Sequence, residues 1–502
     1  MSTTIVTMFF NLTTLPDATP AVRPQSFYME KGRATLALPY PMVVFCDETT
    51  IDEIKRIRGD QPTQYIVKPI YEYDLYKHNY ATIRKNREGV ANYIGSRNTS
   101  SYFLLCMFKS LALLISKQQN TFDTTHFAWI DFGGSHVMRN FDQGARRMVE
   151  NPNPKVSFCY IDYRSADDLC VIDSRLTREG WCGAACTSYT VEGAYMDRFY
   201  NGTMAIFHEM LAKGVGHNDE QVMTYFFNRY PELCSIYYGD YFSILSNYKY
   251  PCEDYNTIRW CFLNKVQCAG RYDLARACIA ALFKSVADGH LAMSDDEYKT
   301  LDTMSLLFRN EYGHEINHLY TERTEQLQAE RYIPANAVVL ELGARYGTVS
   351  CVINRRLSNK LNQVSVEPDA RVWDALERNR YCNSCSFHIV KGVVSKKKLA
   401  LNTNVPDGYC TQTKASEDSS LTCLTLDEVQ EKYNLCFDTL VADCEGFLES
   451  FMDENPVLYT QLVRILFEKD CPDRCNYDKI KEQLVLHGFK CLVDETHEVW
   501  QK

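Results

Sequence analysis

Short apolar runs separated by polar, helix-compatible stretches recur along the first 250 residues. They are TIVTMFF (4–10), PMVVFCDE (41–48), TQYIVKPI (63–70), HFAWIDFGGSH (126–136) and SFCYIDY (157–163). The longest apolar stretch, SYFLLCMFKSLALLISK (101–117), has the pattern of a buried amphipathic helix. Alternating strand and helix patterns predict an α/β sheet with mostly parallel strands. REGWCGAACTSYT (178–190) is interpreted as a glycine-containing turn within this region.

The pattern changes twice further along the chain. Residues 253–328 have helical periodicity and few strand formers, which predicts a helical connector. From 329 to 502, six or seven short apolar runs again alternate with helical stretches. This second alternation predicts a doubly wound α/β domain. The polar interval 401–421 is expected to be a long loop, of the kind that forms lids.

The length of the chain fits this division, because 502 residues exceed one ordinary hydrophobic core. We therefore expect two α/β domains, 1–252 and 329–502, joined by the helical segment 253–328. The net charge of −10 argues against a nucleic-acid partner, whose binding surface would need a basic excess. Lys109 interrupts the 101–117 stretch, which is also short for a bilayer, so no transmembrane segment is expected.

Cysteine is abundant but odd in number and irregularly spaced, with 21 residues. Reduced thiols in a cytoplasmic compartment fit this pattern better than a disulfide scaffold. The amino-terminal residues lack the basic region and cleavage site of a signal peptide. An alternative use of the thiols is a zinc site formed by Cys382, Cys385, Cys471 and Cys475, although nothing in the sequence brings the two pairs together.

Acidic residues follow the apolar runs of the third segment. Glu341 ends the first run, before Gly343 and Gly347 allow a tight turn close to a ligand. Glu367 ends the second run at a distance from Gly343 typical of an acid that binds ribose hydroxyls. Asp443 ends a further run, and if 440–444 is a strand, Asp443 and Glu445 share a face. The spacing predicts a nucleoside-containing cofactor. Because the glycines do not follow the pattern G-x-G-x-x-G, a nicotinamide or flavin cofactor is disfavoured.

The motifs VVLELGARYGTVS, VEPDARVWDALERN, LTLDEVQ and DTLVADCEGFLESF resemble those of FkbM-type S-adenosylmethionine-dependent methyltransferases, over about 335–495. The departure is Arg345–Tyr346 in the glycine turn. The resemblance implies a Rossmann-like fold and S-adenosylmethionine as cofactor. The cofactor-binding residues that it implies are Glu341, Gly343, Gly347, Glu367, Asp369, Val393 and Asp443.

For the chemistry of this segment, Asp443 is the expected catalytic base or orienting group, with Glu445 second. An alternative for Glu445 is a structural cap on the following helix. His388 and Lys469 are rival candidates for the base.

The first segment has a similar strand end, FAWIDFGG, in which Asp131 precedes two glycines. An acid at this position suits a divalent cation bridging a diphosphate, although no full D-x-D is present. Farther along, His217, Asp219 and Glu220 lie at a helix entrance and suit a catalytic or acceptor-binding cluster. Asn218 or Asp219 acting only as a helix cap is the alternative.

TIVTMFFNL, PMVVFCDETT, FAWIDFGG, NDEQVMTYFF and YYGDYFSILSNY resemble stretches of GT-A-type glycosyltransferases, in particular the HtrL/YibB-type family, over about 1–250. The resemblance implies that nucleotide-sugar is bound by Phe10, Asn11, Asp47, Asp131 and Gly133. It also implies Mn²⁺ on Asp131, with Asp219 or Glu220 as catalytic residues facing the acceptor. The basic stretch 80–89 is a candidate phosphate contact.

Together the two resemblances predict a bifunctional enzyme that transfers a sugar from a nucleotide-sugar donor and O-methylates a hydroxyl of the glycan acceptor. Physical linkage would raise the local concentration of the intermediate at the second site. One alternative is a methyltransferase whose first domain only binds glycan or nucleotide-sugar. Another is a scaffold in which neither pocket turns over.

Overall fold

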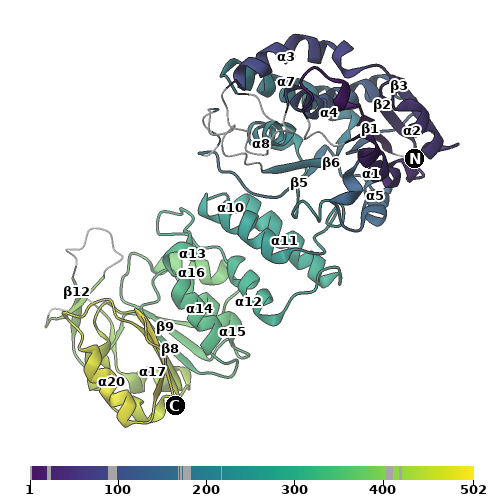
Figure 1. The fold of residues 1–502 in the computed structure, drawn as a ribbon. Coiled ribbons are helices and arrows are strands. Elements are labelled where there is room, and N and C mark those ends of the chain that lie inside the picture. Colours follow the sequence, from purple (N-terminus) through teal and green to yellow (C-terminus); the bar gives the residue numbers. More distant parts are fainter. Residues whose placement is uncertain are drawn as a thin grey trace. The chain divides into compact units, whose positions relative to one another are not determined.

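The computed structural model describes residues 3–19, 24–88, 99–167, 169, 172, 183–215, 218–402, 411–417 and 421–502. The chain forms two compact units, Met1–Met293 (unit 1) and Ser294–Lys502 (unit 2) (Figure 1). Each unit contains its own seven-stranded sheet with helices around it, so the fold is of the α/β class, as predicted. The boundary between the units falls inside the predicted helical connector, whose residues are divided between them.

The sheet of unit 1 has the strand order β3-β2-β1-β4-β6-β5-β7. Its strands are β1 (Thr3–Phe9), β2 (Met42–Cys46), β3 (Thr63–Val67), β4 (His126–Ile130), β5 (Val156–Tyr160), β6 (Ala184–Glu192) and β7 (Tyr237–Tyr238). β1 to β4 pair in parallel, whereas β6 runs antiparallel to both β4 and β5. The interpretation of 178–190 as a turn is therefore wrong for its second half, which is a strand buried on both faces.

Unit 1 contains helices, some of which pack against the strands of its sheet. They are α1 (Gln25–Ala37), α2 (Ile51–Arg58), α3 (Asp74–Asn86), α4 (Ser100–Gln119), α5 (Phe141–Glu150), α7 (Met196–Ala212), α8 (Asp219–Arg229), α9 (Tyr255–Thr257), α10 (Asn264–Cys268) and α11 (Tyr272–Ala287). α4 is the predicted amphipathic helix, capped by the Thr99 side chain, which accepts a hydrogen bond from Tyr102 N. Within the described residues it is the one helix long and apolar enough to span a bilayer, but most of it is buried in unit 1 as a core helix.

The sheet of unit 2 has the order β10-β9-β8-β15-β16-β18-β17. Its strands are β8 (Val339–Leu342), β9 (Gln363–Glu367), β10 (His388–Lys391), β15 (Thr439–Ala442), β16 (Arg464–Glu468), β17 (Lys490–Val493) and β18 (His497–Gln501). All pairs are parallel except those of β18, which lies antiparallel between β16 and β17. The chain runs outward from β8 in both directions, so the strand order reverses between β8 and β15.

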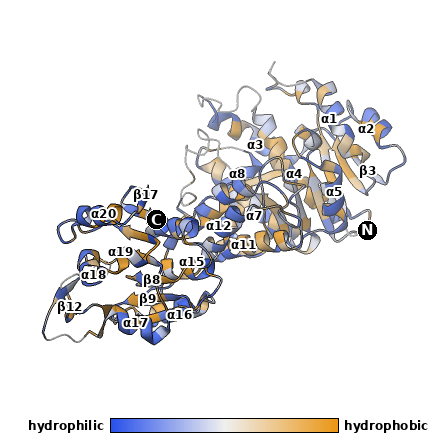
Figure 2. Ribbon diagram, turned by 90° about the horizontal axis from the view of Figure 1, so that it is seen from below, coloured by the Kyte–Doolittle hydropathy of each residue, from blue (hydrophilic) through white to orange (hydrophobic). Residues whose placement is uncertain are grey.

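Alternate residues of these strands face two separate apolar layers, as the pleat requires. Leu340, Leu342, Leu440 and Ala442 belong to one buried cluster, whereas Val339 and Val441 belong to the other. The helices of unit 2 are α12 (Asp295–Met304), α13 (His318–Thr321), α14 (Arg323–Tyr332), α15 (Thr348–Arg356), α16 (Trp373–Cys382), α17 (Leu426–Tyr433), α18 (Leu448–Glu454), α19 (Leu458–Gln461) and α20 (Tyr477–Leu486). α14 to α16 contribute to the second cluster and α17 to α20 to the first. In Figure 2 the strands are mainly hydrophobic and the exposed helix faces hydrophilic.

Two small sheets lie beyond the main sheet of unit 2. β11 (Val393–Val394) pairs with β14 (Cys423–Leu424), and β12 (Leu399–Leu401) pairs with β13 (Thr413–Ala415). The predicted loop 401–421 is therefore partly a strand, and its residues 403–410 and 418–420 lie outside the described part of the chain.

The described cysteines are free thiols, as predicted. The alternative of a four-cysteine zinc site is wrong: within the described residues Cys382 and Cys385 join no cluster with metal-ligand geometry. Cys471 clusters instead with two carboxylates.

Candidate functional site

A cavity of about 80 Å³ opens at the carboxyl ends of β8, β9 and β15, where the strand order reverses. Ligands of open α/β sheets bind at such a switch point. Five of the residues predicted from the sequence line this cavity, namely Gly343, Glu367, Val393, Asp443 and Glu445. Residues from five separated stretches of the chain thus meet at one edge of the sheet.

Gly343 allows the strand ends to approach each other at the cavity. Its φ is +89°, and a Cβ on it would lie 1.6 Å from the carbonyl oxygen of Asp443. Asp443 N in turn donates to the carbonyl of Leu342 at 3.0 Å. Gly343 therefore joins the two loops that form the mouth of the cavity.

We expect Gly343→Ala to lower the free energy of unfolding of unit 2 by more than about 3 kcal/mol, since backbone clash adds to left-handed strain. Gly488→Ala is the matched control, because Gly488 has φ +86° but no atom within 4 Å of a Cβ. The control should cost only about 1–2 kcal/mol. Denaturant unfolding of the full chain measures both, and equal costs for the two variants would contradict the close approach.

Glu367 is buried and accepts two backbone hydrogen bonds. Its Oε2 accepts from Arg345 N at 2.6 Å and its Oε1 from Asp369 N at 2.7 Å. Burial raises the pKa of this carboxyl to about 7. These bonds fix the carboxylate beside the cavity, where its remaining lone pairs can accept hydrogen bonds from ligand hydroxyls.

The other predicted cofactor residues have different surroundings. Asp369 is buried and accepts from the Arg371 guanidinium at 2.7 Å. Although burial opposes it, this pairing holds the pKa of Asp369 below its usual value. Gly347 has φ +79° and begins α15. Glu341 is buried within β8 and does not line this cavity; its Oε2 accepts from Ser365 Oγ at 2.5 Å.

Glu341 lines a second, smaller cavity of about 60 Å³, which is also lined by Asp443. Four carboxyl groups besides Glu341 line it: Glu322, Glu325, Asp443 and Glu468. Burial, followed by the charges of Glu468 and Glu322, raises the pKa of Asp443 well above its usual value. The interaction of Asp443 with Glu468 raises the pKa of Asp443 and contributes to the lowered pKa of Glu468. Asp443 is thus the carboxyl group that lines both cavities.

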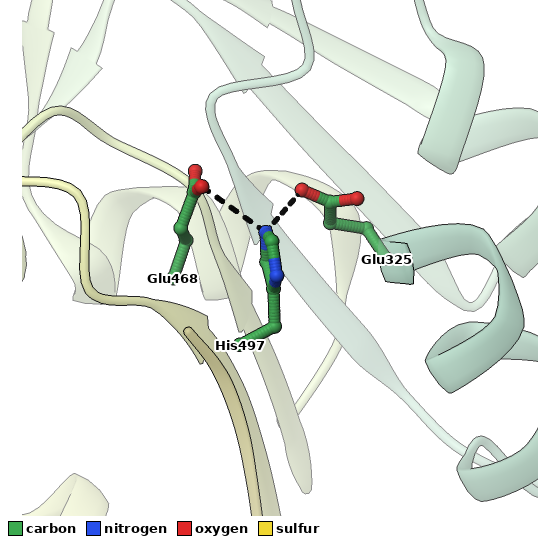
Figure 3. Close-up of side chains that lie close together, drawn as sticks. All are labelled: Glu325, Glu468 and His497. Carbon is green, nitrogen blue, oxygen red and sulfur yellow. Dashed lines mark ion pairs between the residues drawn. The ribbon is translucent and has the colours of Figure 1, made fainter. Parts of the chain in front are cut away.

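His497 neutralises part of this acidic cluster. Its Nε2 lies between Glu325 Oε1 and Glu468 Oε1, with 3.1 Å to the latter (Figure 3). Although burial opposes the charge, the ion pairs with these two glutamates raise the pKa of His497 to about 10. His497 is therefore an imidazolium at neutral pH. Sequence reasoning missed this trio, although RILFEKD ends on an acid as the other strands do.

We expect the stabilisation supplied by His497 to be lost at high pH. Its folded pKa of about 10 exceeds the ordinary 6.5, so the contribution is complete below pH 6.5 and disappears as pH rises toward 10. Denaturant unfolding of the full chain and of His497→Gln measures it as a difference. The difference should shrink with rising pH, and a difference independent of pH would contradict the ion pair.

Glu445 lies in a turn rather than on a strand. β15 ends at Ala442, and Glu445 has φ +51°, so the expected sharing of a strand face with Asp443 is wrong. Its Oε2 lies 3.6 Å from Cys471 Sγ, which donates to it, and burial and the charge of Asp470 raise its pKa to about 7. No side chain caps α18, so the capping alternative is also wrong.

The two rival bases lie away from both cavities. His388 stacks on Tyr433 with ring centroids 4.3 Å apart. Lys469 pairs with Glu498 at 2.6 Å. Neither lines a cavity of unit 2.

Unit 1 has a separate cavity of about 300 Å³ at the ends of β1 and β4. Four predicted residues line it: Phe10, Asn11, Asp131 and Gly133. Much of the remaining wall is aromatic, comprising Phe9, Tyr28, Tyr102, Trp129 and Phe132. Such rings suit the faces of a nucleobase or a sugar.

Lys109 of α4 reaches the floor of this cavity. Its Nζ lies 2.9 Å from Asp131 Oδ1 and 3.0 Å from Asp219 Oδ2, and donates to the Cys186 carbonyl at 3.1 Å. Although burial opposes the charge, the two aspartates hold the pKa of Lys109 well above its usual value. No sequence motif indicated this role, because Lys109 appeared only as an interruption of an apolar helix.

The remaining predicted residues of unit 1 lie outside the cavity wall. Asp47 accepts from Asn11 N and Thr49 N, both at 2.9 Å, so it fixes two loops. Glu220 accepts from the Tyr241 hydroxyl at 3.0 Å. Asn218 caps α8, which confirms the cap alternative for this residue. His217 lies outside the described residues, and no described residue of 80–89 lines the cavity.

The arrangement at Asp131 does not fit a resident divalent cation. Its Oδ1 already accepts from Lys109 and, at 2.7 Å, from Trp129 Nε1. Within the described residues, every group of three or more potential metal ligands lies in unit 2. The Mn²⁺ prediction therefore gains no support from the geometry of this strand end.

Residues 1–249 match the HtrL_YibB family. The family is described as "Bacterial protein of unknown function", so the HtrL_YibB match supplies no activity, and residues 250–502 lie beyond it. No curated protein matches the chain at significant similarity.

Solved structures similar to parts of the chain include the precorrin-6y C5,15-methyltransferase of Geobacter metallireducens (16% identity, 36% of this chain and 88% of that chain, TM-score 0.24). Another is fibrillarin of Aeropyrum pernix with natively bound S-adenosyl-L-methionine (14% identity, 36% and 74%, TM-score 0.24). A third is apo mouse xyloside xylosyltransferase 1 (10% identity, 47% and 85%, TM-score 0.27). At such TM-scores these likenesses carry no functional argument.

Proposed function

We propose that the chain is a bifunctional glycan-modifying transferase. Unit 2 would O-methylate a sugar hydroxyl with S-adenosylmethionine, and unit 1 would transfer a sugar from a nucleotide-sugar donor. The observation that carries the proposal is the cavity of unit 2, where a buried acid, a left-handed glycine and Asp443 meet at the switch point of the sheet. The motif resemblance of 335–495 supports the same cofactor.

The described residues of the cavity fit S-adenosylmethionine by the chemistry of their groups. Glu367 would accept hydrogen bonds from ribose hydroxyls, because its carboxylate is held in place by two backbone donors. Gly343 would let the backbone approach the ligand, since a side chain there has no room. When bound, the cofactor supplies an electrophilic methyl group on a positively charged sulfur.

Asp443 would orient the acceptor hydroxyl and take its proton. It directly follows β15, and its carboxyl group lies within 4.8 Å of that of Glu468. His497 stabilises the negative charge of Glu468 and so limits the charge that Asp443 faces. Methyl transfer is mainly a matter of alignment, so a fixed carboxylate at this point serves it.

In unit 1 the aromatic cavity would hold the nucleotide-sugar, with Asp131 facing its polar groups. The second candidate is a methyltransferase whose first unit binds a glycan or nucleotide-sugar without turnover. The pairing of Asp131 and Asp219 with Lys109 favours this alternative, because it leaves neither carboxylate free as an unpaired base. The free thiols are compatible with the proposed cytoplasmic location.

A thermal-shift screen of the full chain tests the proposal. S-adenosylhomocysteine should raise the unfolding temperature of one transition, and one member of a panel of nucleoside-diphosphate sugars should raise that of another. No response to S-adenosylhomocysteine would contradict the methyltransferase. Binding of a nucleotide-sugar without sugar release or transfer would leave the binding-only alternative for unit 1.

A further inference from the structure

The floor of the unit 1 cavity contains an ion-pair cluster that no motif predicted. Lys109 projects from the middle of α4, a helix whose other buried residues are apolar or serine, and its side chain is only 9% exposed. A buried ammonium is costly unless it is paired and hydrogen-bonded. Here it forms ion pairs with the carboxylates of Asp131 and Asp219 and donates a hydrogen bond to the Cys186 carbonyl.

We infer that Lys109 stands in unit 1 where a divalent cation would stand, and that this cavity binds its ligand without a metal ion. The two aspartates come from a strand end and from the first turn of α8, and Lys109 joins them as a bridging cation would. An ammonium and a metal ion compete for Asp131 Oδ1 and Asp219 Oδ2, so Lys109 prevents an ion from bridging the two aspartates through these oxygens.

The cluster also explains how Asp131 faces the cavity. Both of its fixed contacts, from Lys109 Nζ and Trp129 Nε1, use Oδ1. Within the part of the chain that the structure describes, no donor contacts Oδ2, and the Asp131 side chain is 34% exposed on the cavity wall. Lys109 and Trp129 thus act as positioning residues that present Oδ2 as a hydrogen-bond acceptor.

This arrangement selects a class of ligand. A fixed carboxylate oxygen accepts from hydroxyl groups but repels phosphate, and aromatic rings surround it. The hydroxylated sugar portion of a ligand therefore fits at Asp131 better than a metal-bridged diphosphate. This assignment rests on the proposed binding of a nucleotide-sugar by unit 1, whereas the exclusion of a metal does not.

Mn²⁺ binding to the full chain, followed by the electron paramagnetic resonance signal of free Mn²⁺, tests the exclusion. The wild-type protein and Asp131→Asn should bind the same number of ions, because no ion uses Asp131. Loss of one bound ion in Asp131→Asn would overturn the inference. The comparison is internal, so ions held by the acidic cluster of unit 2 cancel.

Lys109→Met supplies the converse test, since methionine keeps the length of the side chain and removes its charge. The variant should gain one Mn²⁺ that Lys109→Met/Asp131→Asn lacks. A folded Lys109→Met protein that gains no ion would show that Lys109 does not occupy a cation position. If circular dichroism shows that the variant is unfolded, the comparison of wild type with Asp131→Asn decides alone.

Calorimetry with uridine diphosphate and uridine-diphosphate glucose as probes separates this inference from the proposed function. Affinities in a chelator and in Mn²⁺ should agree within about twofold. Affinity that appears only with Mn²⁺ and is lost in Asp131→Asn would overturn the inference while supporting nucleotide-sugar binding. The assignment of the sugar to Asp131 would be supported by two results together. Mn²⁺ should not change the affinities, and Asp131→Asn should lower the affinity for uridine-diphosphate glucose but not for uridine diphosphate.

Discussion

Replacing Asp443 by asparagine is expected to lower the rate of methyl transfer by about 10²- to 10³-fold while changing the affinity for S-adenosylmethionine by less than about threefold. The amide keeps the size of the side chain and cannot take up the hydroxyl proton. Single-turnover kinetics and calorimetry measure the two quantities. Equal losses of rate and affinity would remove the catalytic role and leave a binding role.

The pH dependence of the rate provides a second readout for Asp443. Burial and the charges of Glu468 and Glu322 raise its pKa, so the wild-type rate should rise with pH as its proton is lost. This rise should disappear in Asp443→Asn. Asp438→Asn is the matched control. Asp438 directly precedes β15, at the amino-terminal end of the strand that Asp443 follows, and accepts from Val338 N at 3.1 Å. It should change stability but not the pH profile.

Glu367→Gln is expected to weaken binding of S-adenosylhomocysteine by about 2–3 kcal/mol, which corresponds to roughly 30- to 150-fold. The substitution removes the charge that would pair with ribose hydroxyls and weakens the support of two backbone donors. Isothermal titration calorimetry measures the loss.

Glu341→Gln is the matched control for this variant. Glu341 lies on the neighbouring strand β8 and is also buried, but it does not line the cavity of Glu367 and its carboxylate accepts from Ser365. We expect it to lower stability and to leave the affinity for S-adenosylhomocysteine within about threefold of wild type. Unchanged affinity in Glu367→Gln would contradict the position of the cofactor.

The α/β architecture could be predicted from the sequence because the alternation of strand and helix patterns is a local property of the chain. Strand patterns at 339–342 and 363–367, with glycine turns between strand and helix, predicted the doubly wound unit 2 correctly. The antiparallel β6 was missed because its buried residues follow a glycine and no polar alternation marks them. Local pattern carries no information on the direction in which a strand pairs.

The site was predictable only as far as strand ends mark it. Gly343, Glu367 and Asp443 were found, since each follows or ends an apolar run. The same reasoning from strand ends predicted that Glu341 binds the cofactor. Side chains alternate along a strand, so Glu341 points away from the face of Leu342, and only Leu342 lines the first cavity. The roles of Lys109 and His497 depend on contacts with residues distant in the sequence. Lys109 and Asp131 are 22 residues apart, and His497 and Glu468 are 29 residues apart. No local pattern encodes such contacts.

The position of β18 has a consequence for how unit 2 is made. Residues 497–501 form an inner strand that joins β17 to β16, and His497 at its start also completes the acidic cluster. During synthesis, residues 497–501 must leave the ribosome before the seven-stranded sheet can be completed. Until then, the edge of β16 that pairs with β18 is exposed. The sheet of unit 1 has all its strands by residue 238 and can fold much earlier. A pause in translation between the two sheets would then delay the folding of unit 2 and leave that of unit 1 unaffected.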